Sequence, residues 1–192
     1  MKTIIEQLTL LEIFGFTFSV IQVLLARYNK PQNYLFGIAG ITLTLFVMFR
    51  EKLYAEFTLK IYYLIMSIYG WLYWKYGKKN TEIQITRTQP HEWQKVIAIV
   101  IISFLLFFTV LTFYTDSDVP LLDSLVSAFA WAGMWLMAKR KLENWILLNI
   151  SNAISIPLLL YKDLYLYAIL SLILFIVAIS GYYNWKKIIN RT

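Results

Sequence analysis

The sequence contains no cysteine and few charged residues. Without a thiol, the chain cannot form a disulfide, a catalytic thiolate or a zinc–thiolate site. Charged residues make up only 15% of the 192 residues, whereas a soluble domain carries about 25%. Hydrophobic residues make up 59%. So few charges cannot solvate a globule with this much apolar surface, and the excess is expected to face lipid.

The sequence also lacks the signatures of common catalytic and cofactor sites. It has no glycine-rich phosphate loop followed by lysine, no His-Glu-x-x-His and no Gly-x-Ser-x-Gly. The one histidine, His91, has no partners for a metal site and is interpreted as a solvated loop residue. We therefore predict that the protein is not an enzyme and holds no cofactor or metal.

Long apolar runs predict an all-α integral membrane protein with seven transmembrane helices. The expected helices cover residues 7–26, 33–50, 53–76, 95–114, 121–138, 144–160 and 163–185. The runs lack the strict alternation of barrel strands, which disfavours a β-barrel. Residues 1–192 are expected to form a single transmembrane domain.

Basic residues are concentrated in every second loop. These loops and the C-terminal tail contain Arg27, Lys30, Lys75, Lys78, Lys79, Arg87, Lys95, Lys139, Arg140, Lys141, Lys186, Lys187 and Arg191. The loop 115–120 is acidic instead. Because cytoplasmic loops are enriched in Lys and Arg, this pattern predicts an N-terminus outside and a C-terminus in the cytoplasm. The net charge of +7 is interpreted in the same way, and not as a sign of nucleic-acid binding.

The chain contains an internal repeat, in which the segment 53–75 aligns with 164–186 without a gap. The identities include Gly70 with Gly181 and Trp74 with Trp185, and the same alignment places Asn33 over Asn144. The first repeat would cover about 7–76 and the second about 121–185, with the helix at 95–114 as a connector. Three helices plus a connector give both repeats the same orientation, which is typical of transporters with a site near the bilayer midplane.

Polar and aromatic residues inside the predicted helices are the candidate binding residues. Trp145, Asn149 and Asn152 share one face of the helix at 144–160. Amides in hydrocarbon either pair between helices or face a binding cavity. The repeat partners of the two amides, Ile38 and Ile41, are apolar, which favours a role specific to one helix.

Aromatic residues on two other helices complete this set. Ser67, Trp71 and Trp74 share a face of the helix at 53–76, and Trp131 and Trp135 share a face of the helix at 121–138. Tryptophans near helix ends also occur as interfacial anchors, an alternative that applies most strongly to Trp74. Aromatic walls with nearby amides suit a flat, cationic ring that carries a polar arm.

Several motifs resemble the Pnu-type vitamin transporters of bacterial inner membranes. These motifs are Leu53-Tyr54-Ala55-Glu56, Tyr69-Gly70-Trp71 with Trp74, Asp123-Ser124, Glu143-Asn144-Trp145, Ser155-Ile156-Pro157, Tyr161-Lys162-Asp163-Leu164-Tyr165, and Gly181-Tyr182 with Trp185. The resemblance covers about residues 10–187. It implies a 3+1+3 fold like that of the SWEET sugar transporters, and facilitated diffusion driven by phosphorylation of the vitamin by a cytoplasmic kinase.

The resemblance also implies a site between the third and sixth helices. Carried onto this sequence, it places Trp71, Trp74, Asn144, Trp145 and Asn152 at or beside the ligand. The branch that carries nicotinamide riboside has three tryptophans on the third helix, and here the first of those positions is Ser67. This departure leaves thiamine as an alternative substrate. A substrate-capture module that does not transport, and a homo-oligomer, also stay open.

Overall fold

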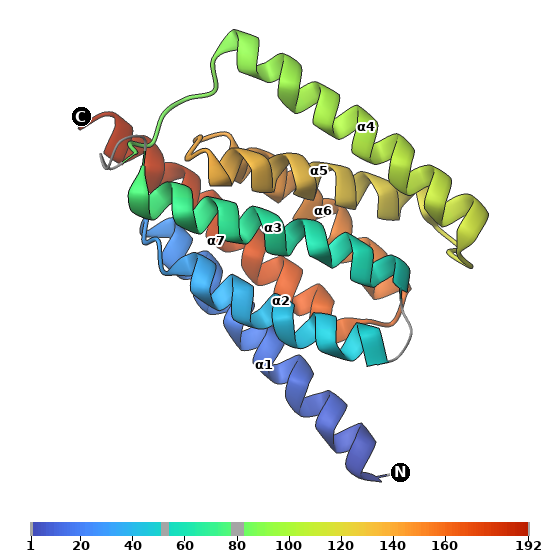
Figure 1. Ribbon diagram of the computed structural model, residues 1–192. Helices are drawn as coiled ribbons and strands as arrows, with labels where there is room; N and C mark the ends of the chain where they lie inside the picture. Colours follow the sequence, from blue (N-terminus) through green and yellow to red (C-terminus); the bar gives the residue numbers. More distant parts are fainter. Residues whose placement is uncertain (1, 51–53, 78–82, 192) are drawn as a thin grey trace. The chain divides into compact units, whose positions relative to one another are not determined.

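The computed structural model describes residues 2–50, 54–77 and 83–191, and these residues form seven α-helices (Figure 1). The helices are α1 (Lys2–Arg27), α2 (Asn33–Arg50), α3 (Tyr54–Tyr76), α4 (Pro90–Tyr114), α5 (Pro120–Ala138), α6 (Asn144–Tyr161) and α7 (Tyr165–Ile189). The all-helical prediction is confirmed. Most of the predicted segments begin close to the observed helix, whereas α1 and α4 both begin more than a turn earlier than predicted.

Five helices in the described residues are long and apolar enough to cross a membrane. They are α1 over Leu10–Arg27 and the whole of α4, α5, α6 and α7. The described apolar stretch of α2, Asn33–Leu45, is shorter. The chain is therefore a multi-pass membrane protein. The predicted number of spans, seven, is larger than the five that the described residues support.

The chain divides into two compact units, Met1–Glu82 and Ile83–Thr192. In the first unit, α2 packs against both α1 and α3. In the second unit, α4 packs on α5, α5 on α6 and α6 on α7. Short loops join α5, α6 and α7, so consecutive helices of the second unit run antiparallel.

Helix α4 begins before its apolar run, at Pro90. Proline suits the first turn of a helix because its missing N–H would have no intrahelical partner. The backbone N–H of Gln89 donates to the Glu92 carboxylate over 2.8 Å, which caps the same end. His91 is exposed, as expected, but it lies in this first turn and not in a loop.

The segment 83–89 before α4 is fastened to the turn between α5 and α6. The backbone N–H and hydroxyl of Thr88 donate to Glu143 over 2.7 and 2.6 Å. Thr86 exchanges backbone hydrogen bonds with Arg140 and Leu142 over 3.1 and 2.9 Å. The buried Arg140 guanidinium also donates to the Ile83 carbonyl. Together these bonds fix the chain where α6 begins.

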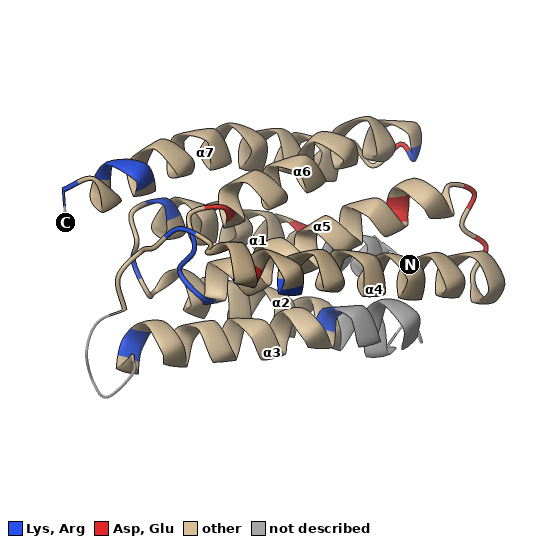
Figure 2. Cartoon of the chain, turned by 90° about the horizontal axis from the view of Figure 1, so that it is seen from above, with Lys and Arg blue, Asp and Glu red and all other residues tan. Residues whose placement is uncertain are grey.

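The opposite end of the second unit is held by a different ion pair. Lys162, after α6, lies 2.7 Å from the Asp123 carboxylate in the first turn of α5. Figure 2 shows acidic residues in the loop between α4 and α5 and basic residues at the C-terminal end of α7. The two ends of this unit therefore differ in charge, as the predicted orientation requires. Which end faces the cytoplasm stays a prediction.

The two units share the same turn geometry at positions that the repeat aligns. Asn29 and Arg140 both have positive φ, 57° and 55°. At the start of the helix that follows each turn, the Asn33 and Asn144 side chains donate to the carbonyls of Lys30 and Lys141 over 2.7 and 2.5 Å. Both asparagines are fully buried. A side chain that bonds its own turn in this way fixes how the next helix starts.

An aromatic contact also recurs at aligned positions of the repeat. In the first unit the rings of Tyr34 and Trp74 meet edge to face at 5.1 Å, and in the second Trp145 and Trp185 do so at 5.5 Å. A glycine lies under each pair, because a Cβ at Gly70 would come within 2.5 Å of Tyr34 and one at Gly181 within 2.7 Å of Trp145. The repeat in the sequence is therefore matched by repeated contacts inside each unit.

Candidate functional site

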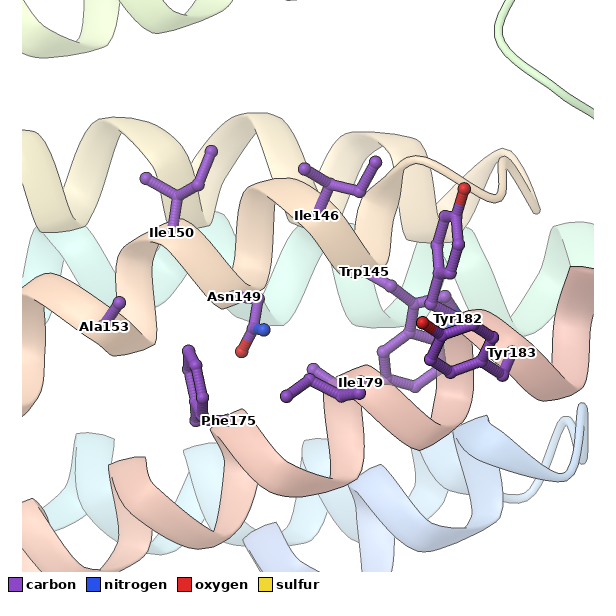
Figure 3. Close-up of a pocket in the computed structure, with 10 residues that line it drawn as sticks. Trp145, Ile146, Asn149, Ile150, Ala153, Phe175, Ile179, Tyr182 and Tyr183 are labelled. Carbon is purple, nitrogen blue, oxygen red and sulfur yellow. The ribbon is translucent and has the colours of Figure 1, made fainter.

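A groove of about 430 Å³ lies between α6 and α7. It is lined by Trp145, Ile146, Asn149, Ile150 and Ala153 of α6 and by Phe175, Ala178, Ile179, Tyr182 and Tyr183 of α7. Figure 3 shows Asn149 pointing from α6 into the space above Phe175 and Ile179, with the three larger rings at one end. Ligand sites commonly combine apolar walls with a few polar groups in this way.

Asn149 is the polar group on the α6 side of the groove. Trp145, Asn149 and Ala153 recur at every fourth position, so they share one face of the helix. The Oδ1 atom of Asn149 is buried and accepts no hydrogen bond from any residue that the structure describes. A buried amide oxygen left in this state destabilises a protein by about 1–3 kcal/mol. A hydroxyl or amide of a ligand would supply the missing donor if the groove admitted it to this atom.

Trp145 forms the aromatic end of the groove together with Tyr182 and Tyr183. Its position is fixed because its ring packs on Trp185 and lies directly over Gly181. Its Nε1 is buried and finds no acceptor among the described residues. The rings of Tyr182 and Tyr183 meet edge to face at 5.8 Å. Trp145 itself is buried, so the ring faces that this end offers to a flat or cationic ligand are those of Tyr182 and Tyr183.

Pro157 interrupts the hydrogen bonding of α6 next to the groove. In an α-helix the N–H of this position would donate to the carbonyl one turn earlier, at Ala153. Proline has no N–H, so it cannot satisfy the Ala153 carbonyl. Ala153 lines the groove, so α6 lacks one of its regular backbone hydrogen bonds beside the site.

The other predicted site residues of the second unit lie outside the lining of this groove. Asn144 is fully buried, and its Oδ1 accepts no hydrogen bond from the described part of the chain. Asn152 is half-buried on α6. Trp131 packs edge to face on Phe107 of α4 at 4.7 Å, and Trp135 packs against the small core cluster of Val96, Ala132, Leu136 and Leu147. These two tryptophans therefore hold α5 against α4.

Ser67, Trp71 and Trp74 lie in the first unit, on α3. Ser67 is fully buried, and its hydroxyl makes no hydrogen bond within the described residues. Trp74 is buried beside Tyr34. Trp71 is half-buried, with the Lys75 ammonium 5.2 Å from its ring centroid. The structure thus brings Trp145 and Asn149 together in one groove of the second unit, and the α3 residues belong to the first unit.

Sequence reasoning missed the α7 wall of the groove. Phe175, Tyr182 and Tyr183 were not among the predicted residues, although the repeat contains a signal for them. The alignment of the two repeats relates Ser67 to Ala178 and Trp71 to Tyr182, and both second-unit partners line the groove. The prediction that Trp71 contacts the ligand therefore implies the same prediction for Tyr182.

Apolar helices long enough to span a membrane, together with a groove lined by aromatic rings and one amide, are typical of membrane proteins that bind a small organic molecule. The chain belongs to the family described as "Nicotinamide mononucleotide transporter", whose model matches residues 9–187. The resemblance to the Pnu-type transporters is thereby confirmed.

Curated relatives and a solved structure agree with this family. The chain is 25% identical over 204 residues to the "Nicotinamide riboside transporter PnuC" of Escherichia coli (strain K12). The aligned region covers 93% of this chain and 85% of that protein. It is 27% identical over 178 residues to the protein of the same name from Haemophilus influenzae, covering 90% of this chain and 77% of that protein. The fold is similar to the "Crystal structure of the Vitamin B3 transporter PnuC", with a TM-score of 0.75 and 22% identity over 95% of this chain and 83% of that one.

Proposed function

We propose that this protein carries nicotinamide riboside across the bacterial inner membrane into the cell. The observation that carries the proposal is the groove between α6 and α7. Its rings suit a flat, positively charged pyridinium, and Asn149 has a buried oxygen ready for a hydroxyl of the ribose. The names of the curated relatives support the same substrate.

The lining of the groove favours the riboside over the mononucleotide in the family's description. The two molecules differ by a phosphate, which proteins bind with Arg, Lys or several backbone N–H groups. None of the described residues that line the groove is basic. A phosphate there would be buried without a partner, which is strongly unfavourable.

We propose the 3+1+3 arrangement for the whole chain, as one transmembrane domain of seven spans with the N-terminus outside and the C-terminus in the cytoplasm. The shared turn at Asn29 and Arg140 and the shared aromatic pairs over Gly70 and Gly181 support a parallel repeat. The alternation of basic and acidic loops supports the orientation. The site residues predicted on α3, α5 and α6 stay part of this proposal.

Transport would be facilitated diffusion, with net uptake driven by a cytoplasmic kinase that phosphorylates the riboside. The absence of basic residues from the described lining of the groove supports retention of the product by phosphorylation, because a phosphorylated riboside would rebind poorly there. The kinase would act as a functional partner, and the proposal requires no stable complex with it.

Proteoliposomes test the transport step directly. Vesicles with purified protein, preloaded with a riboside kinase and ATP, should accumulate labelled nicotinamide riboside, and vesicles without kinase should only equilibrate. Saturable binding without entry would contradict transport and favour a substrate-capture module. Failure to bind or transport the riboside would contradict the proposal as a whole.

Thiamine is the second candidate because of one residue. Ser67 stands on α3 where the riboside branch carries a tryptophan. Its buried side chain is much smaller and carries a hydroxyl in place of an aromatic ring. Competition by unlabelled thiamine in the same vesicles separates the two substrates. Thiamine that competes better than the riboside itself would replace the main proposal.

A further inference from the structure

The ring of Trp71 already holds a cation in the structure. The Nζ atom of Lys75 lies 5.2 Å from the centroid of the Trp71 ring and 5.1 Å from that of Tyr76. Trp71 and Lys75 are one helical turn apart on α3, so their side chains lie on the same face of the helix. An ammonium within about 6 Å of an indole face is attracted by the negative charge of the ring face.

Trp71 is also one of the proposed contacts of the substrate. Its repeat partner, Tyr182, lines the groove between α6 and α7. The riboside carries its positive charge on a flat ring, and an indole face such as that of Trp71 attracts a ring of this kind. One ring face has room for a single cation at close range, and two like charges about 4 Å apart repel each other by about 1 kcal/mol even in water.

We propose that Lys75 is an internal competitor of the cationic substrate for the ring of Trp71, an inference that rests on the proposed function. The ammonium occupies the ring while the site is empty and must leave when the substrate binds. Lys75 therefore raises the Michaelis constant for positively charged ligands and speeds their release. It does not act on an uncharged ligand of the same shape.

The second repeat shows that this arrangement is specific to α3. Lys186 is the repeat partner of Lys75 and stands one turn after Tyr182, just as Lys75 follows Trp71. Within the part of the chain that the structure describes, no cation–ring contact joins Lys186 to Tyr182. Lys186 thus has the same charge and the same place on its helix without a ring under its ammonium, which makes it a matched control.

Substitution of Lys75 tests the competition with two forms of the riboside. The oxidised form has a cationic ring, and the reduced dihydropyridine form has the same ribose but a neutral ring. In proteoliposomes, Lys75→Gln should lower the KM for the cationic form by about two- to fivefold, the value of an exposed cation–ring contact. The KM for the neutral form should stay the same.

Two further variants separate competition from a general effect of charge. Lys75→Arg keeps a cation over the ring and should keep the KM of the parent protein, whereas Lys186→Gln removes a charge elsewhere and should change neither KM. An unchanged or higher KM for the cationic form in Lys75→Gln, or equal shifts of KM for both forms, would overturn the inference. Uptake of the riboside by the parent protein would still support the proposed function in that case. If the parent protein itself took up neither form, the proposed function and this inference would fail together.

Discussion

Asn149 and Ile38 stand at equivalent positions of the two repeats and differ in polarity. Both are half-buried, yet one half of the molecule keeps an apolar side chain and the other an amide. The buried Oδ1 of Asn149 has no partner among the described residues and lies in the groove. An amide that served only to hold helices together would be expected to pair, so the unpaired oxygen favours a role in ligand binding.

Replacing Asn149 with leucine should therefore weaken binding without unfolding the protein. Leucine has a similar volume and suits the apolar walls, but it removes one hydrogen bond to the ribose. A neutral hydrogen bond contributes about 0.5–1.5 kcal/mol, so affinity should fall by about two- to tenfold. Equilibrium binding of labelled riboside to purified protein measures this loss.

The control for this variant is Ile38→Leu, which replaces one apolar side chain with another at the equivalent position of the first repeat. It should leave the affinity almost unchanged. Asn152→Leu, measured in parallel, tests the second predicted amide. A normal affinity in Asn149→Leu together with a loss in Asn152→Leu would move the polar contact away from the groove.

The sequence predicted the face of α6 that matters but not which amide enters the groove. Asn149 and Asn152 are separated by slightly less than one turn, which places them about 60° apart around the helix axis. Both therefore satisfy the same periodic pattern. The choice between them depends on where α7 packs, and this follows from the contact of Trp145 with Gly181. Helical periodicity contains no information about such a contact.

At the scale of the helices, one small residue sets the distance between α6 and α7. Gly181 lies directly under the ring of Trp145, and a Cβ there would come within 2.7 Å of ring carbons. Gly70 has the same relation to Tyr34 in the first unit. The close approach of each helix pair requires glycine at these positions for lack of space, because neither glycine has an unusual φ.

Gly181→Ala should accordingly destabilise the protein. Overpacking of this kind lowers the free energy of unfolding by about 1–3 kcal/mol, and Gly70→Ala should act in the same direction. Thermal unfolding in detergent, followed by the loss of monodisperse protein, measures the change. Gly15→Ala is the control, since no atom lies within 4 Å of the added Cβ and alanine favours a helix by about 0.5–1 kcal/mol. Equal stability of Gly181→Ala and the parent would show that α6 and α7 move apart at little cost.

A second prediction at this scale concerns the segment 83–89. Thr88→Val keeps the shape of the side chain but removes the hydroxyl that donates to Glu143 over 2.6 Å. Loss of a hydrogen bond to a charged group lowers stability by about 1.5–3 kcal/mol, which reduces the Tm by several degrees in a chain of this size. Differential scanning measurements should show this loss.

Thr88→Ser retains the hydroxyl and should restore most of the stability. Thr86→Val changes an exposed side chain on the same segment, where Thr86 bonds through its backbone, and should have little effect. A Tm for Thr88→Val equal to that of the parent would mean that Glu143 is satisfied by the backbone N–H alone.

The start of α4 shows where hydropathy stops being informative. The apolar run begins near Lys95, but the helix begins at Pro90, because Pro90 and the Glu92 cap stabilise a hydrophilic first turn. Apolar runs predicted all seven helices because burial in lipid requires continuous apolar segments. They could not locate a helix end that lies in water and depends on local hydrogen bonds.

At the scale of the whole molecule, the orientation can be tested with single cysteines, because the chain has no thiol of its own. Asp118 and His91 are exposed and lie at the opposite ends of α4. Asp118→Cys should react with a membrane-impermeant reagent added outside intact cells, and His91→Cys should react only after the membrane is opened. The opposite pattern would reverse the proposed orientation.

The proline of α6 gives this helix mechanical properties that a continuous helix lacks. Both of its ends are fastened, the first through Glu143 to Thr88 and the last through Lys162 to Asp123. Pro157 removes a hydrogen bond between these anchors, so bending is easiest there. The stretch that carries Trp145 and Asn149 can then tilt relative to the last turn while both anchors stay closed. A tilt of this kind would change the width of the groove on the microsecond to millisecond timescale of collective helix motions. The elasticity of a single helix would then limit how fast the protein completes a transport cycle.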